Sequence, residues 1–273
     1  MTRIAICAPA TPITRDVAEA VTKLAAAEFP EIELAFHEQC FVEEGHFAGP
    51  DAVRLDALLE CANDPASDAV WFARGGYGSN RIAEAAIGLL GPAAQGKAYL
   101  GFSDCGFLLA GLYKAGIGCP AHGPMPVNIR SGEASVRRAL AWLSADDEGL
   151  EPGLDDRPTV AFNLMTLAAL TGTPLMPDLA GHVVIVEEVA EHLYAIDRLF
   201  FHVVAQLGGI AGLRLGMVTA VPENDRPFGS EAEDIARYWC ASAGIPYLGR
   251  AQIGHDPANR IVPFGLARGA SGA

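Results

Sequence analysis

The sequence predicts an α/β protein with two units, an amino-terminal doubly wound, mostly parallel sheet of the flavodoxin-like type and a smaller, strand-rich α/β unit after it. Short apolar, β-branched runs alternate with alanine-rich helical patterns through the first half, which is typical of a parallel sheet covered by helices. Residues 144–158 then interrupt this pattern with acidic side chains, glycines and prolines. The length of 273 residues also fits two domains better than one.

The first unit is expected to cover residues 1–143. Its strands are the short apolar runs at residues 4–8, 33–36, 69–73 and 98–102. Helical spacing of apolar side chains appears at residues 17–29, 52–63, 81–90, 106–115 and 136–143. The alternation of these two kinds of element predicts the doubly wound arrangement.

Residues 144–158 are interpreted as a linker, and residues 159–273 as the second unit. Strands are expected there at residues 183–186 and 212–221, and helices at residues 163–170, 196–207 and 230–243. A turn-rich tail follows the last of these helices.

The composition indicates an ordinary globular chain, with 51% hydrophobic and 19% charged residues. A net charge of −14, from 33 acidic and 19 basic residues, argues against a nucleic-acid partner. The apolar run at the amino terminus is too short for a signal peptide, and no stretch approaches the ~18 apolar residues of a membrane span. The six cysteines are scattered without metal-binding spacing. We therefore expect a reduced, soluble, cytoplasmic protein that uses no metal or cofactor.

A glycine-rich segment, residues 74–79 (RGGYGS), stands at the carboxyl end of an expected strand. Ligands of open α/β sheets bind at that edge, and a glycine run lets backbone amides approach an anion or a developing oxyanion. A tight turn without a ligand is the alternative.

Ser103 follows the next expected strand and precedes the helix at residues 106–115. A serine at such a strand-to-helix turn presents its hydroxyl outward, and the amide of the following residue, Asp104, can stabilise an oxyanion, as in a nucleophile elbow. The local sequence is not G-x-S-x-G, however, and a helix cap is the alternative role for Ser103.

Two further residues carry groups that can activate a hydroxyl. Glu187 ends an apolar strand, where a buried carboxylate requires a partner such as an imidazolium. His255 lies in a polar turn, and imidazole as a chemical group is suited to take a proton from serine and return it to a leaving amine. The alternatives are an exposed strand end for Glu187 and a surface loop for His255. His122, which precedes a turn, is interpreted as structural.

Taken in order, these clusters resemble the LD-carboxypeptidase family of serine peptidases, which includes a microcin-immunity type. The resemblance runs over nearly the whole chain and is carried by residues 8–9 (AP), 74–78 (RGGYG), 101–104 (GFSD), 122–125 (HGPM), 163–164 (NL), 172–174 (GTP), 186–189 (VEEV), 191, 194, 196–198 (IDR), 254–255 (GH) and 263–265 (PFG). Cys105, Phe162 and Glu188 depart from the family's usual residues, but none of them removes a proposed catalytic atom.

The resemblance implies that Ser103 is the nucleophile, His255 its general base and Glu187 the acid that orients the base. It also implies an oxyanion hole formed by the backbone amides of Gly76 and Asp104. Because these residues are far apart in the sequence, the triad has to be assembled across both units.

The implied activity is that of a serine carboxypeptidase that hydrolyses the bond between the L-centre of a diamino acid and a terminal D-alanine, as in murein tetrapeptides during cell-wall recycling. Arg74 and Tyr77 are candidate substrate contacts, Arg74 because a carboxypeptidase must bind a terminal carboxylate. The alternatives are a hydrolase of peptide-nucleotide conjugates, as in the microcin-immunity type, and a non-catalytic small-molecule binding protein. The resemblance also implies a homodimer.

Overall fold

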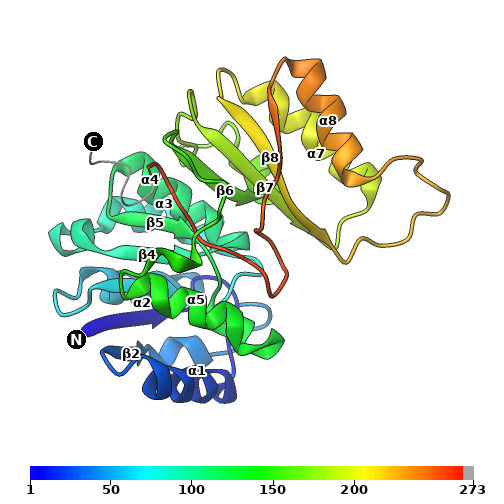
Figure 1. Cartoon of the computed structure of the whole chain (residues 1–273). Helices are drawn as coiled ribbons and strands as arrows, with labels where there is room; N and C mark the ends of the chain where they lie inside the picture. The colour runs from blue at the N-terminus through cyan, green and yellow to red at the C-terminus, as the bar shows by residue number, and fades with distance from the viewer. Residues whose placement is uncertain (267–273) are drawn as a thin grey trace.

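The described residues, 1–266, form two β-sheets in the computed structural model (Figure 1). The first sheet contains β1 (Thr2–Cys7), β2 (Ile32–Phe36), β3 (Ala69–Phe72), β4 (Ala98–Gly101), β5 (Cys119–His122) and β10 (Val262–Pro263), in the order β10-β5-β4-β3-β1-β2. Strands β1 to β5 are parallel, and β10 is antiparallel to β5. The order 2-1-3-4-5 is the flavodoxin-like one, so the predicted fold of the first unit is confirmed.

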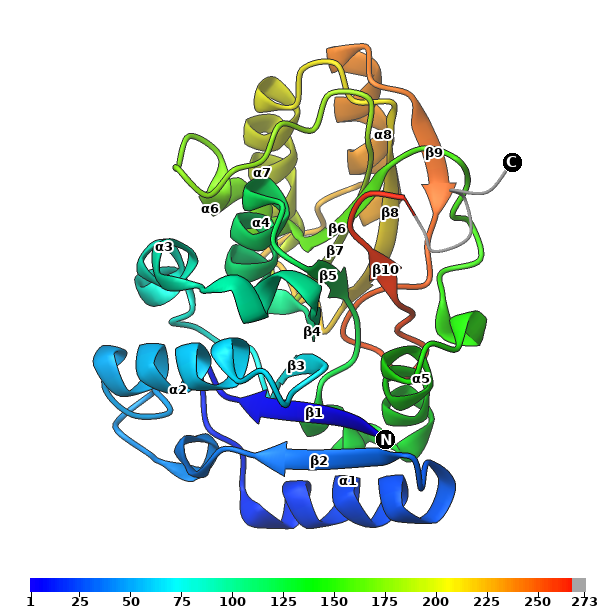
Figure 2. The same cartoon turned by 90° about the vertical axis from the view of Figure 1, so that its left-hand side faces the viewer.

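Helices cover both faces of this sheet (Figure 2). They are α1 (Arg15–Glu28), α2 (Asp51–Asn63), α3 (Asn80–Leu89), α4 (Gly106–Ala115) and α5 (Glu133–Leu143). Helices α1 and α5 bury Val21 and Leu140 in one core with Ile4 of β1. Helices α2, α3 and α4 bury their apolar sides in a second core, with Val70 and Phe72 of β3. Short 3-10 helices lie at Glu38–Phe41, Pro92–Gly96, Ser103–Cys105, Pro126–Ser131 and Asp147–Gly149.

The second sheet is parallel throughout and has the order β6-β7-β8-β9. Its elements are β6 (Thr159–Asn163), α6 (Leu164–Leu170), β7 (Val183–Val189), α7 (Leu193–Gln206), β8 (Gly212–Thr219), α8 (Ala232–Ala243) and β9 (Tyr247–Arg250). Val184 of β7 belongs to a core shared with Phe200 of α7 and Ala236 of α8. No helix within residues 1–266 is long and apolar enough to cross a membrane.

The end of the chain returns from the second sheet to the first, as the red segment of Figure 1 shows. After β9, Ala251 and Ile253 cover the face of the second sheet opposite α7 and α8, and Val262 of β10 then pairs with His122 of β5. The segment that contains His255 therefore runs between the two sheets. Residues 267–273 of the predicted second unit lie outside the described part of the chain.

Candidate active site

Ser103 lies in a tight turn between β4 and α4. Its φ angle is 59°, which is unusual for a residue other than glycine and marks a strained strand-to-helix turn. The neighbouring loop fits closely against this turn, because a Cβ atom on Gly75 would lie 3.2 Å from the Ser103 Cβ. The Ser103 hydroxyl makes no capping bond to α4. Its described partner is the ring of His255.

Glu187 is placed by the two-residue period of β7. Val183 and Ile185 belong to the core beneath the returning segment, whereas Val184 and Val186 belong to the core beneath the helices. Glu187 has the parity of the first pair, so its carboxylate faces the returning segment. The side chain is fully buried.

His255 connects the other two residues. Its Nδ1 lies 2.8 Å from Glu187 Oε2, and its Nε2 lies 3.2 Å from Ser103 Oγ. A carboxylate can only accept a hydrogen bond, so the Nδ1–H donates to Glu187 and Nε2 is left to accept from the serine hydroxyl. The Phe102 ring lies against the imidazole, with 4.8 Å between ring centroids.

Glycines make this close approach possible. A Cβ atom on Gly254, whose φ is 134°, would lie 3.2 Å from the Glu187 carboxylate oxygen Oε2. A Cβ atom on Gly216 of β8 would lie 3.0 Å from the Glu187 Cβ and 2.7 Å from the Ile253 carbonyl oxygen. Side chains at these two positions would separate the imidazole from the carboxylate.

The glycine-rich segment presents backbone amides beside Ser103. Thr11 Oγ1 donates a 2.6 Å hydrogen bond to the Gly75 carbonyl oxygen. Because C=O and N–H point in opposite directions across a trans peptide, this bond turns the Gly76 amide away from Thr11. Within the described residues, neither the Gly76 amide nor the Asp104 amide donates a hydrogen bond. Both are free to bind an anionic oxygen.

Buried charges hold that segment in place. Asp104 accepts hydrogen bonds from the amides of Ser79 at 2.8 Å and Gly78 at 3.4 Å, and burial raises the pKa of its carboxyl group. Arg54 is fully buried and donates to the carbonyl oxygens of Gly78, at 2.8 Å, and of Pro9. The sequence analysis did not identify Thr11 or Arg54, because the Gly75, Pro9 and Gly78 carbonyl oxygens that they bind are backbone atoms distant in the sequence.

Two cavities flank Ser103, and their charged residues differ. One, of about 310 Å³, is lined by His255 and Arg74 and has no acidic residue in its lining. The other, of about 350 Å³, is lined by Asp104, Glu188 and Glu191 and has no basic residue in its lining.

Glu188 and Glu191 differ in their own surroundings. The Glu188 carboxylate accepts hydrogen bonds from the Asn163 side chain at 2.8 Å and from the Met165 and Val189 amides at 2.9 and 2.8 Å. Burial raises the pKa of Glu188. Glu191 makes no side-chain hydrogen bond or ion pair with residues 1–266. It is therefore available to a ligand.

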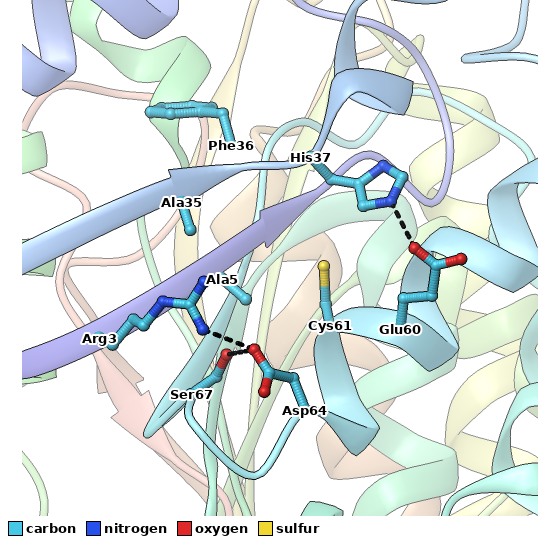
Figure 3. A pocket seen from close by; sticks show the side chains of 9 residues that line it. All are labelled: Arg3, Ala5, Ala35, Phe36, His37, Glu60, Cys61, Asp64 and Ser67. Carbon is cyan, nitrogen blue, oxygen red and sulfur yellow. Dashed lines mark hydrogen bonds and ion pairs between the residues drawn. The ribbon is translucent and has the colours of Figure 1, made fainter.

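A separate cavity of about 350 Å³ lies between β1, β2 and α2 at the edge of the first sheet (Figure 3). Its charged side chains are paired with one another, Arg3 Nη1 with Asp64 Oδ2 at 2.6 Å and His37 Nε2 with Glu60 Oε2 at 2.9 Å. None of the predicted site residues lines this cavity. Nor do the described residues contain a group of three His, Cys, Asp or Glu side chains able to hold a metal ion.

The structure thus brings Ser103, His255 and Glu187 together in succession. Gly76, whose amide is one of the two candidates for the oxyanion hole, lines both cavities beside Ser103. The two candidate substrate contacts separate, Arg74 lining the cavity with His255 and Tyr77 lining the other. His122 is buried in β5.

A hydroxyl, an imidazole and a buried carboxylate in succession, at the carboxyl end of a parallel sheet, define the class of serine hydrolases. Comparisons with known proteins give the family. The model of the LD-carboxypeptidase N-terminal domain matches residues 4–123, and that of the LD-carboxypeptidase C-terminal domain matches residues 158–268. The chain belongs to the LD-carboxypeptidase family.

Curated relatives extend over most of the chain. A murein tetrapeptide carboxypeptidase of Pseudomonas aeruginosa is 27% identical over 288 residues, which cover 96% of this chain and 91% of the relative. A Synechocystis protein named as a carboxypeptidase is 31% identical over 249 residues, which cover 85% of this chain and 79% of the relative.

Solved structures share the fold. The crystal structure of muramoyltetrapeptide carboxypeptidase from Oxalobacter formigenes has a TM-score of 0.80 at 24% identity, covering 97% of this chain and 93% of that chain. The microcin C7 self immunity protein MccF in its wild-type apo state has a TM-score of 0.75 at 16% identity, covering 97% of this chain and 91% of that chain.

Proposed function

We propose that the protein is a serine carboxypeptidase that hydrolyses an L,D-peptide bond and releases a terminal D-amino acid, D-alanine, from murein tetrapeptides. The observation that carries the proposal is the contact series from Glu187 through His255 to Ser103, set between two cavities that differ in charge. The names of the curated relatives support the choice of substrate.

In the first half of the reaction, Ser103 Oγ attacks the carbonyl carbon of the scissile peptide while His255 Nε2 takes the hydroxyl proton. The resulting oxyanion is stabilised by the amides of Gly76 and Asp104. Hydrogen bonds of this kind are each worth roughly 3 kcal/mol of barrier. Glu187 stabilises the imidazolium that forms.

In the second half, the tetrahedral intermediate collapses and the C–N bond breaks. His255 gives its proton to the leaving amine, so the D-amino acid departs and the acyl group stays on Ser103 as an ester. A water molecule then loses a proton to His255 and attacks the ester carbonyl. The second tetrahedral intermediate collapses with breakage of the bond to Ser103 Oγ, and His255 returns the proton to this oxygen. The acid product leaves and the serine hydroxyl is restored, without a metal or cofactor in the scheme.

The proton transfer to the leaving amine also determines which end of the substrate occupies which cavity. Because His255 must reach the leaving amine, the D-amino acid occupies the cavity that His255 and Arg74 line, where Arg74 can pair with its terminal carboxylate. The acyl side then occupies the other cavity, where the unpaired Glu191 carboxylate can receive the side-chain ammonium of a diamino acid. This orientation fits a substrate with an amine on the acyl side and an acid on the leaving side.

The corresponding biological role is the trimming of murein peptides during cell-wall recycling in the cytoplasm, by a homodimer. Light scattering during size-exclusion chromatography would test the homodimer. A monomer at micromolar concentration would contradict it.

The direct test is mass-spectrometric detection of D-alanine release from a synthetic L,D-tetrapeptide. We expect turnover by the wild type and a loss of at least about 10³-fold in Ser103→Ala and His255→Ala. The same peptide with a terminal L-alanine should be resistant. Equal turnover by all three proteins would show that Ser103 and His255 are not the catalytic residues.

A second arm uses an aminoacyl sulfamoyl nucleoside, the kind of ligand named for a structural relative, MccF. Cleavage of this compound with no release of D-alanine would favour the microcin-immunity type of activity. If wild type cleaves neither substrate, a non-catalytic binding role becomes the better explanation.

A further inference from the structure

The segment that carries His255 is tied to the first sheet through two buried side chains. His122, at the end of β5, is only 1% exposed, and its Nε2 lies 3.3 Å from Asn259 Oδ1. The same Asn259 oxygen accepts a 3.0 Å hydrogen bond from the Gly254 amide. Gly254 immediately precedes His255, so the interaction reaches the backbone next to the imidazole.

The hydrogen-bond chemistry fixes the orientation of both side chains. An amide N–H can only donate, so Asn259 must present its oxygen, not its nitrogen, to Gly254. His122 Nε2 therefore carries a hydrogen and donates to that oxygen as well. Neither His122 Nδ1 nor Asn259 Nδ2 has a partner within residues 1–266. Burial lowers the pKa of His122 to about 3, so the ring stays neutral.

We propose that His122 and Asn259 are positioning residues that hold the His255 segment at the distance from which the imidazole can take the Ser103 proton. The proposal rests on the role of His255 as the base. The geometry between the two histidines supports it, because one aromatic ring touches both. The centroid of Phe102 is 4.8 Å from that of His255 and 5.3 Å from that of His122.

Other contacts also hold the segment, among them a 2.7 Å hydrogen bond from the Met217 amide to the Ile253 carbonyl oxygen. Arg138 of α5 donates to the carbonyl oxygens of Asn259, at 3.1 Å, and of Pro257. Arg260 donates to the Gln252 side chain and to the Glu148 carbonyl oxygen, both at 3.3 Å. In the described chain, the side chain that accepts the Gly254 amide is Asn259. Its loss leaves a buried amide unpaired beside the base and frees the backbone there to shift.

If the Asn259 and His122 contacts fix the position of the imidazole, their loss should change the kinetics in a specific way. Displacement of a catalytic group by about 1 Å can cost roughly 10²-fold in rate. The cavities that bind the two ends of the substrate are not lined by His122 or Asn259. Loss of positioning should therefore lower kcat and leave KM nearly unchanged.

The experiment compares a disruptive and a conservative variant at each position. Asn259→Ala removes the acceptor and Asn259→Asp keeps it. His122→Met removes the donor, whereas His122→Gln keeps a donor nitrogen near the place of Nε2. We expect kcat for D-alanine release to fall by about 10- to 100-fold in Asn259→Ala and His122→Met. Asn259→Asp and His122→Gln should stay within about 5-fold of wild type, and KM should change less than 3-fold in all four.

Arg260→Gln is the matched control, because it removes contacts of the same segment without touching Gly254. Its kcat should equal that of the wild type. Far-UV circular dichroism at the assay temperature, together with thermal unfolding curves, establishes that each variant is folded. Wild-type kcat in folded Asn259→Ala, or equal losses in Asn259→Ala and Asn259→Asp, would overturn the proposal.

A second readout does not depend on the natural substrate. A fluorophosphonate is attacked by an activated serine with loss of fluoride, and the hydroxyl proton passes to the base. We expect labelling of wild-type Ser103, with the rate lowered at least 10-fold in Asn259→Ala and restored in Asn259→Asp. If this pattern holds while no D-alanine is released, the substrate proposal fails and the positioning role stands. If Asn259→Ala is labelled at the wild-type rate, the positioning role fails whatever the substrate.

Discussion

At the scale of single residues, the Ser103 turn has a backbone conformation that costs a side-chain-bearing residue roughly 1–3 kcal/mol. Close packing maintains it. Gly75 fits against the Ser103 Cβ, and the Thr166 hydroxyl donates to the Ser103 carbonyl oxygen at 3.4 Å. The neighbouring residues thus hold the turn in the conformation that directs the hydroxyl at the imidazole, before any substrate arrives.

The charges of the two cavities lead to a prediction at the same scale. In Arg74→Met, KM for a tetrapeptide with a free terminal carboxylate should rise about 10-fold, because a charge-assisted hydrogen bond at a partly open site is lost. KM for the peptide with an amidated terminus should stay the same.

In Glu191→Gln, the preference for a lysine over a norleucine on the acyl side should fall by a similar factor. Steady-state kinetics with the four peptides measures both effects.

Arg130→Met provides the control for the first substitution. Arg130 is exposed, lines neither cavity and donates to the Thr14 hydroxyl. Its loss should leave KM for both termini unchanged. If Arg74→Met shifts KM equally for acid and amide peptides, Arg74 does not bind the carboxylate.

At the scale of elements, β1 to β4, β7 and β8 were predictable because each has a local apolar signal, whereas β5, β6, β9 and β10 were not predicted. Val183 to Val186 form an uninterrupted apolar run, and β1, β3 and β4 are similar. β5 was not predicted, because its four residues, Cys119–His122, include Pro120. β10 has only two residues, Val262–Pro263, and pairs with a partner distant in the sequence. The periodicity of apolar residues cannot reveal a strand of only two residues.

The glycine-rich segment depends on a buried guanidinium, which gives the second prediction. Arg54→Met leaves the buried carbonyl oxygens of Pro9, Gly49 and Gly78 without this donor. We expect a loss of about 2–4 kcal/mol in the free energy of unfolding. The rate of D-alanine release should fall as well, since the Gly76 amide belongs to the same segment. Urea denaturation and single-substrate kinetics check the two effects.

Arg81→Met is the matched comparison, because Arg81 and Arg54 share the partner Asp51. The Arg81 side chain is 47% exposed, whereas that of Arg54 is 0% exposed. Exposed ion pairs contribute about 0–1 kcal/mol. Similar losses of stability in the two variants would show that the Asp51 pair, not the buried carbonyl oxygens, accounts for the effect.

At the scale of the whole molecule, the candidate triad depends on the path of the chain. Ser103 follows a strand of the first sheet, Glu187 lies in the second sheet, and His255 lies on the segment that returns between them. Local sequence could nominate each residue, because each stands next to a strand end or a glycine. The link between His122 and Asn259 joins residues 137 positions apart and has no local pattern, so it required the structure.

The burial of His122 also leads to a prediction about stability at acid pH. Burial lowers the pKa of His122 to about 3, while an unfolded histidine titrates near 6.5. Below about pH 6.5 the unfolded chain binds a proton that the folded protein excludes. Folding stability is therefore lost from this group as the pH falls, by up to about 1.4 kcal/mol per pH unit until about pH 3. Asp104 and Glu188 act in the opposite direction, because burial raises the pKa of both and the folded protein accepts their protons first.

A variant isolates the histidine contribution from these opposing ones. His122→Gln keeps a donor for Asn259 but does not titrate, whereas Asp104 and Glu188 are present in both proteins. The difference in free energy of unfolding, His122→Gln minus wild type, should be nearly constant above pH 7 and increase by about 2 kcal/mol between pH 7 and pH 5. Urea unfolding curves at several pH values give this difference directly. If the difference does not change with pH, the folded protein binds a proton at His122 as readily as the unfolded chain does, and the neutral donor assigned to this ring is wrong.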